Sequence, residues 1–164
     1  MQQNISKAFL GILRLFMGFV FFWAFIDKAF GLGFATPAEK AWFAGGSPTT
    51  GFLQFAAKGP FQEFYNSLAG VPLIDYLFML GLLFVGITLL LGIFVRLGSL
   101  VGALMLLLMY GALGLPPENN PFIDDHLINA LVMGALAFGN SGKYFGFGRV
   151  WSETALVQKH NLLQ

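Results

Sequence analysis

The chain has 164 residues, of which 57% are hydrophobic, 16% aromatic and only 10% charged. A soluble domain has about a quarter of its residues charged, so this composition and a mean hydropathy of +0.73 indicate an integral membrane protein. The net charge of +1 is uninformative about nucleic acid, but the sequence has no basic stripe or cluster, so no nucleic-acid partner is expected. The absence of cysteine excludes disulfides, thiol catalysis, iron–sulfur clusters and cysteine-ligated zinc.

The first apolar run predicts a membrane-spanning helix over residues 8–26, between Lys7 and the pair Asp27-Lys28. It is too long for the hydrophobic part of a signal peptide, so we expect it to be retained. Arg14 lies inside this span, where a charge must either reach the interface or find partners. It can anchor the span or bind carbonyl groups inside the bundle, or it can hold an anionic or quinone oxygen. Trp23, one turn before Asp27, is typical of the aromatic belt.

Residues 31–76 form a long connection that is too rich in aromatic side chains to be a disordered linker. The spacing of its apolar residues predicts two short amphipathic helices, over 48–58 and 60–68. Neither is long enough to span a bilayer. We therefore expect residues 41–68 to form an interfacial or re-entrant segment, which serves either as a surface anchor or as a lid over a substrate.

Three further spans are predicted, over residues 75–95, 97–115 and 121–139. Gly98 and Gly102 let helices approach closely in the third span. In the fourth, Asn120 suits the helix cap and Pro121 the first helical position. The fold class is therefore an all-α integral membrane protein, a four-transmembrane-helix bundle with short interfacial helices in its first loop. Residues 1–164 form one domain, with a cytoplasmic tail over 140–164.

The basic residues predict the orientation of this bundle. Four spans place both termini on one side, together with six of the cations: Lys7, Arg14, Arg96, Lys143, Arg149 and Lys159. The opposite side carries most of the acidic residues. The positive-inside rule then predicts cytoplasmic termini in the cell's inner (plasma) membrane.

This orientation brings charged residues from three spans to one outer rim of the bundle. Carboxylates beside a lysine and an imidazole can relay protons or bind a quinone carbonyl, although single charges also belong at helix ends for interfacial reasons. The residues predicted to be catalytic are Lys28, Asp125 and His126. The residues predicted to bind substrate or quinone are Arg14, Trp23, Asp27 and Asp124. The histidine spacing predicts no metal site.

Several blocks of sequence resemble the DoxX family, and more closely its DoxD-like branch. They are Leu13-Arg14-Leu15 with Gly18, Phe25-Ile-Asp-Lys-Ala-Phe-Gly-Leu-Gly33, Ala41-Trp42 with Gly45-Gly-Ser-Pro-Thr49 and Gly51-Phe-Leu53, Asn120-Pro-Phe-Ile-Asp124 with His126, and Gly146-Phe-Gly-Arg149 with Trp151. Proteins of this branch are labelled as the membrane subunit of thiosulfate:quinone oxidoreductase or as a thiosulfate dehydrogenase (quinone) large subunit. The resemblance implies a four-span bundle.

The resemblance also implies electron transfer from thiosulfate to a membrane quinone, with a second redox subunit as partner. Neither a haem-binding histidine pair nor a flavin motif is present in the sequence. The alternative is a non-enzymatic module: a scaffold, a lipid-binding protein or a small transporter. The lipid bilayer is a partner in either case. Small residues on several helix faces suit packing within one chain or between copies of the chain, so the sequence leaves both a monomer and a homo-oligomer as alternatives.

Overall fold

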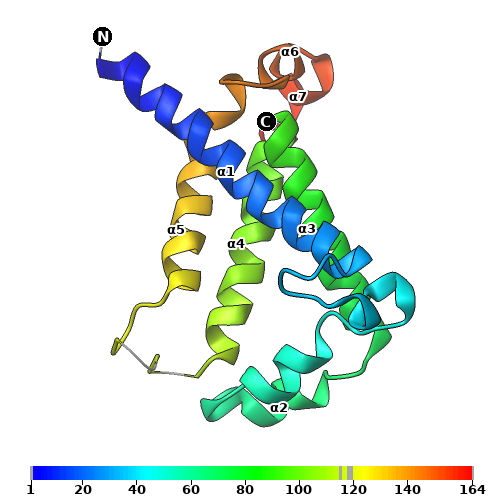
Figure 1. Cartoon of the computed structure of the whole chain (residues 1–164). Coiled ribbons are helices and arrows are strands. Elements are labelled where there is room, and N and C mark those ends of the chain that lie inside the picture. The colour runs from blue at the N-terminus through cyan, green and yellow to red at the C-terminus, as the bar shows by residue number, and fades with distance from the viewer. Residues whose placement is uncertain (1, 115, 118–119, 164) are drawn as a thin grey trace.

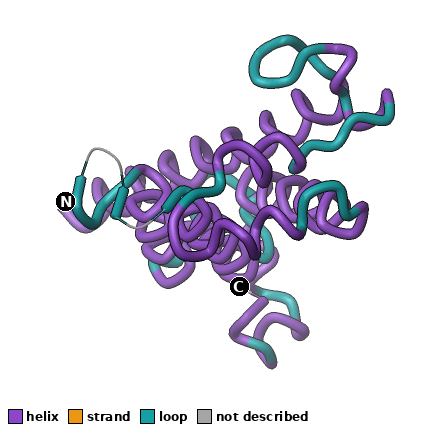
Figure 2. The backbone as a smooth tube through the Cα atoms, turned by 90° about the horizontal axis from the view of Figure 1, so that it is seen from below, coloured by secondary structure: helices purple, strands orange, loops and turns teal. Residues whose placement is uncertain are grey.

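The computed structural model describes residues 2–114, 116–117 and 120–163, and these residues form helices and turns without a β-strand. Four longer helices make up the bundle (Figure 1): α1 (Gln2–Phe30), α3 (Pro72–Leu91), α4 (Val95–Ala112) and α5 (Asp125–Phe138). Three short helices lie outside it: α2 (Gln62–Ser67), α6 (Gly148–Ser152) and α7 (Ala155–Lys159). Figure 2 shows from below how these helices are joined by loops and turns. The all-α class predicted from composition and periodicity is confirmed.

Three helices are long and apolar enough to cross a membrane: Ile5–Phe30 within α1, α3 and α4. They confirm the first three predicted spans, with shifted bounds. α1 is longer than residues 8–26 because Lys7 and Asp27-Lys28 continue the helix, and a lysine in the last turn suits the negative end of the dipole. α3 begins at Pro72 and ends at Leu91, because the next residue, Gly92, adopts a φ of 78° that a helix cannot continue through. The predicted end of the third span, residue 115, lies outside the described residues.

The start of the fourth helix differs from the prediction. Asn120 does not cap a helix that continues through Pro121. Its side-chain oxygen instead accepts hydrogen bonds from the N–H groups of Phe122 (3.0 Å) and Ile123 (3.1 Å), which closes a local turn. The cap is Asp124, which accepts from Leu127 N at 2.9 Å. α5 therefore has 14 residues, or ~21 Å at 1.5 Å per residue, shorter than the ~30 Å hydrocarbon layer. A fourth complete span stays a prediction.

Close helix contacts explain how the bundle is held together without many polar groups. α1 crosses α3 where a Cβ at Gly86 would lie only 2.7 Å from Phe22 Cβ, and one at Gly18 only 2.9 Å from Leu89 Cβ. Gly98 approaches Thr88 on α3, and Gly102 approaches Met133 on α5. The small residues therefore serve packing within this chain.

The connection over residues 31–71 and the approach to α5 lie at one end of the bundle (Figure 1). The start of α1, the α3–α4 turn and the segment after α5 lie at the other end. Where two short amphipathic helices were predicted, over 48–58 and 60–68, the structure has a π turn at Phe52–Ala56 and a 3₁₀ turn at Gly59–Phe61 that leads into α2. Their placement at a membrane interface stays a prediction.

Candidate functional site

Arg14 is fully buried and binds backbone carbonyl groups. Nη1 donates to the carbonyl of Leu89 in the last turn of α3, and Nη2 donates to Tyr144 O (2.8 Å) and Phe145 O (2.9 Å). The last carbonyls of a helix have no partner within it and carry the negative end of the dipole, so a guanidinium suits them. Arg14 thus fastens α1 to the end of α3 and to the segment after α5. The arrangement is the one expected of bonding inside the bundle, and contact with a quinone stays a prediction.

Asp27 also serves the chain itself. It is 2% exposed, and its carboxylate accepts hydrogen bonds from the N–H groups of Phe34 (3.2 Å) and Ala35 (3.0 Å). Trp23, one turn earlier, stacks on Phe19 with 5.8 Å between ring centroids and makes a T-shaped contact with Phe34 at 5.1 Å. Both residues therefore pack the start of the long connection against α1.

Asp75 holds a later part of the same connection, although it was not among the predicted site residues. It is buried in the first turn of α3. Its Oδ1 accepts from Ser47 Oγ (2.9 Å), Thr49 Oγ1 (2.6 Å) and Thr49 N (3.2 Å). The Gly-Ser-Pro-Thr turn that contains Ser47 and Thr49 is visible in the sequence. Its contact with Asp75 is not, because Asp75 lies 26 to 28 residues further along the chain.

Two residues that were predicted for the site in different roles, Asp124 and His126, are hydrogen-bonded to each other. His126 Nδ1 lies 2.8 Å from Asp124 Oδ2, and the side chains are 24% and 18% exposed, respectively. Burial works to raise the pKa of Asp124, but hydrogen bonds from Leu127 N–H and from His126 outweigh it, so the pKa falls below the usual 3.8. Asp124 is therefore a carboxylate at neutral pH, and it orients the imidazole with Nε2 pointing away from the bond.

A pocket of about 420 Å³ opens beside this pair. It is lined by residues from the connection, the end of α4 and the approach to α5: Phe55, Ala56, Lys58, Leu113, Pro117, Asn120, Ile123, Asp124 and Asp125. Lys58 was not predicted to belong to the site. Its backbone N–H donates to Ala112 O at 2.8 Å, which ties the connection to the end of α4. The pocket thus combines one lysine and two carboxylates with apolar walls.

The predicted rim is divided by the fold. Figure 1 shows the end of α1 and the start of α5 on opposite sides of α4. Lys28, in the last turn of α1, is therefore not brought to the Asp124–His126 pair, and Lys58 supplies the cation there instead. Among the described residues, no group of three or more His, Cys, Asp or Glu side chains could hold a metal ion.

Comparison with known protein families identifies the bundle. A family model described as "TQO small subunit DoxD" matches residues 9–144. The chain belongs to the DoxD family. This confirms the resemblance drawn from the sequence, although the description names a small subunit and not the large subunit of the other label. Comparison with curated proteins and with solved structures gives no match.

The family and the three apolar helices together make this chain a multi-pass membrane protein. The match begins within α1 and ends after α5, so it includes Arg14 and the Asp124–His126 pair. α6 and α7 lie beyond it.

Proposed function

We propose that this DoxD-family chain is the membrane subunit of a thiosulfate:quinone oxidoreductase, that it works with a second redox subunit, and that the pocket beside Asp124 receives the quinone headgroup. The chain lies in the inner membrane with both termini cytoplasmic, as the basic residues predict. The proposal is supported by the family description and by one observation of geometry. Asp124, which is hydrogen-bonded to His126, lines a pocket that Lys58 also lines.

The pocket fits a quinone in size and chemistry. Small-molecule sites are commonly clefts of ~300–1,000 Å³ with apolar walls and few polar groups, and this one has about 420 Å³ with Phe55 and Ile123 among its walls. When bound, the quinone supplies the acceptor for two electrons and two protons. Lys58 donates a hydrogen bond to a carbonyl oxygen, and His126, oriented by Asp124, holds or delivers a proton.

Thiosulfate is expected to bind elsewhere. Asp124 is ionised and Asp125 lies beside it in the pocket lining, and two neighbouring carboxylates repel an anion. The second subunit is therefore the expected site of thiosulfate oxidation, and the membrane chain the expected site of quinone contact.

The test is thiosulfate-driven reduction of a short-chain quinone by the protein purified in native lipid with its partner supplied. We expect His126→Asn to lower kcat/KM for quinone about a hundredfold, the lower end of the range for a positioned acid or base. Lys58→Gln, which removes a charged hydrogen-bond donor, should lower it about tenfold. The matched control is Glu63→Gln, an exposed residue of α2. Equal activity in all three variants would remove the pocket from the reaction. A complete lack of thiosulfate-dependent reduction would remove the catalytic role.

A second candidate function is a non-enzymatic membrane scaffold, lipid-binding protein or small transporter. It is favoured by the way three buried charged residues, Arg14, Asp27 and Asp75, bind groups of the chain itself. Mass spectrometry of the protein purified in native lipid separates the two. A retained quinone supports the pocket, whereas a stoichiometric second polypeptide without quinone supports a docking role.

A further inference from the structure

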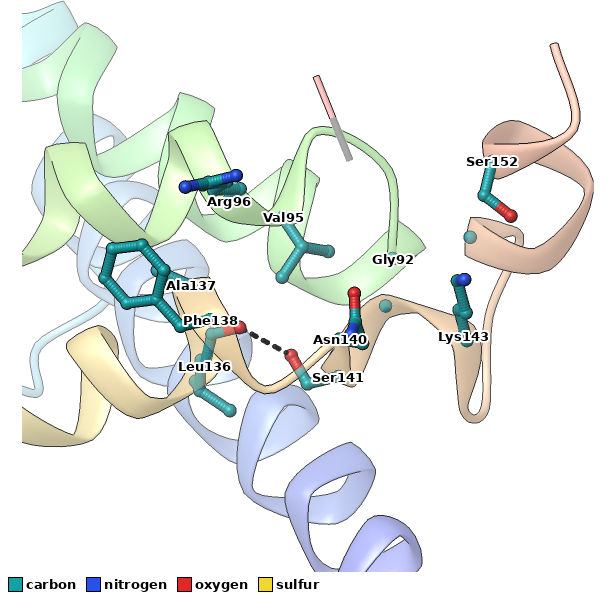
Figure 3. Close-up of a pocket in the computed structure, with 12 residues that line it drawn as sticks. Gly92, Val95, Arg96, Leu136, Ala137, Phe138, Asn140, Ser141, Lys143 and Ser152 are labelled. Atoms are coloured by element: carbon teal, nitrogen blue, oxygen red, sulfur yellow. Dashed lines mark hydrogen bonds between the residues drawn. The ribbon is translucent and has the colours of Figure 1, made fainter. Parts of the chain in front are cut away.

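We propose that a second pocket, at the opposite end of the bundle, binds the phosphate of an anionic phospholipid headgroup. The pocket has a volume of about 270 Å³. The α3–α4 turn, the end of α5, the segment after α5 and α6 enclose it. Its polar side chains include those of Arg96, Asn140, Lys143 and Ser152. Figure 3 shows Asn140 in the view between Arg96 of α4 and Lys143.

The charge of the pocket favours an anion. Among the described residues that line it, two are cations, Arg96 and Lys143, and none is an aspartate or glutamate. Val95 and Arg96 are also the first residues of α4, an 18-residue helix without a side-chain cap, whose N-terminal N–H groups carry positive potential. Basic pockets between membrane helices are the sites at which acidic lipid headgroups bind.

The carbonyl groups at the end of α5 carry negative potential, which disfavours an anion in the pocket. Two of them, however, already accept hydrogen bonds. Ser141 Oγ donates to Leu136 O at 3.2 Å (Figure 3), and Gly139 N donates to Ala135 O at 2.8 Å. These bonds lower the negative potential that the last turn of α5 presents to the pocket. Among the described groups, the two cations and the start of α4 are therefore the features that favour an anion in the pocket.

The wall that carries Lys143 is fixed to the bundle. A Cβ at Gly148 would collide with the carbonyl oxygens of Gly142 and Gly92, so these backbones are in close contact. Phe147 N donates to Leu91 O at 2.8 Å, and Arg14 holds the carbonyls of the residues that follow Lys143. A pocket with such a wall is formed before a ligand arrives, which lowers the cost of binding.

The apolar surroundings favour a lipid over free phosphate. The guanidinium carbon of Arg96 lies 5.0 Å from the centroid of the Phe138 ring. Phe138 is 65% exposed. On the segment that follows Lys143, Phe147 and Val150 are exposed as well. Acyl chains can cover such side chains, whereas a free anion would leave them bare.

The test is native mass spectrometry of the full chain in detergent with phosphatidylglycerol or phosphatidylcholine of identical acyl chains. We expect preferential retention of phosphatidylglycerol. Lys143→Gln should reduce this retention about fivefold, the ~1 kcal/mol expected for one cation near an anionic lipid. The matched control is Arg149→Gln, which removes one charge from another exposed cation six residues away, outside the pocket lining.

Three results would overturn the proposal: equal retention of the two lipids, equal losses in the two variants, or displacement of the lipid by inorganic phosphate as efficient as by short-chain phosphatidylglycerol. The last result would assign the pocket to a free anion. Arg96→Gln provides a second reading. Because Lys143 is exposed, its variant remains informative even if the Arg96 variant folds poorly.

Discussion

Replacement of Arg14 by methionine tests whether the hydrogen bonds of this residue hold α1, the end of α3 and the segment after α5 together. Methionine fills most of the space of the arginine stem, so the change creates little cavity. It removes the donors that reach Leu89 O, Tyr144 O and Phe145 O and leaves these carbonyls without that partner. The expected result is a large loss of stability, together with release of the segment around residues 144–145 from α1.

The size of the loss follows from the number and environment of these bonds. A hydrogen bond from a charged donor contributes about 1.5–3 kcal/mol, so three such bonds set an upper bound of about 9 kcal/mol. The bonds to Tyr144 and Phe145 are only partly buried, and water can replace part of them. We therefore expect Arg14→Met to lower the free energy of unfolding by about 3–5 kcal/mol. At ~2–4 °C per kcal/mol, Tm should fall by about 10 °C.

Thermal unfolding in detergent measures the global loss, and limited trypsin digestion measures the local one. Cleavage after the exposed Lys143 should become faster as the neighbouring segment detaches. Arg149→Met is the control, because it removes an equal charge from an exposed position and should change stability by less than ~0.5 kcal/mol. The stabilising role of the Arg14 hydrogen bonds would be refuted if both variants unfolded at the same temperature and were cleaved at the same rate.

Two further predictions concern packing and pH. Gly86→Ala places a Cβ 2.7 Å from Phe22 Cβ at the crossing of α1 and α3, so Tm should fall by the equivalent of ~1–3 kcal/mol. Gly134→Ala meets nothing within 4 Å and should raise Tm by a few degrees through helix propensity; equal effects of the two substitutions would contradict this packing. For Asp124, folding lowers the pKa below the usual 3.8, so its carboxylate stabilises the fold above that value and loses this effect as pH falls through the lowered pKa. The Tm difference between the native protein and Asp124→Asn should therefore shrink in acid, and a difference independent of pH would rule out this charge effect.

Part of the candidate site could be predicted because it is local in sequence. Asp124 and His126 are two residues apart at the start of a helix, where a carboxylate is favoured and its neighbours are fixed by the turn. The start of α5 was misplaced because Asn120 has two local options, a helix cap or a turn, and the turn prevailed. Sequence pattern alone does not decide between them.

The remaining site residues depend on contacts between distant segments. Lys58 joins Asp124 in one pocket only because the connection is tied to the end of α4, and Lys28 is kept away because α1 crosses to the other side of the bundle. The residues whose carbonyl groups bind Arg14 lie 75 to 131 residues after it in the sequence. Spacing in the sequence carries no information about such pairs.

The sequence by itself determined the class of protein, its three apolar helices of membrane length and its family resemblance, because hydropathy and helical periodicity are properties of contiguous residues. Only the tertiary structure decided which charges meet. Arg14, Asp27 and Asp75 were turned inward to backbone and hydroxyl groups, while Asp124, Lys58 and the pair Arg96 and Lys143 were left at pockets. The physical reason is that a charge buried in an apolar bundle must find a partner within reach, and the crossing and closing of the helices set that reach.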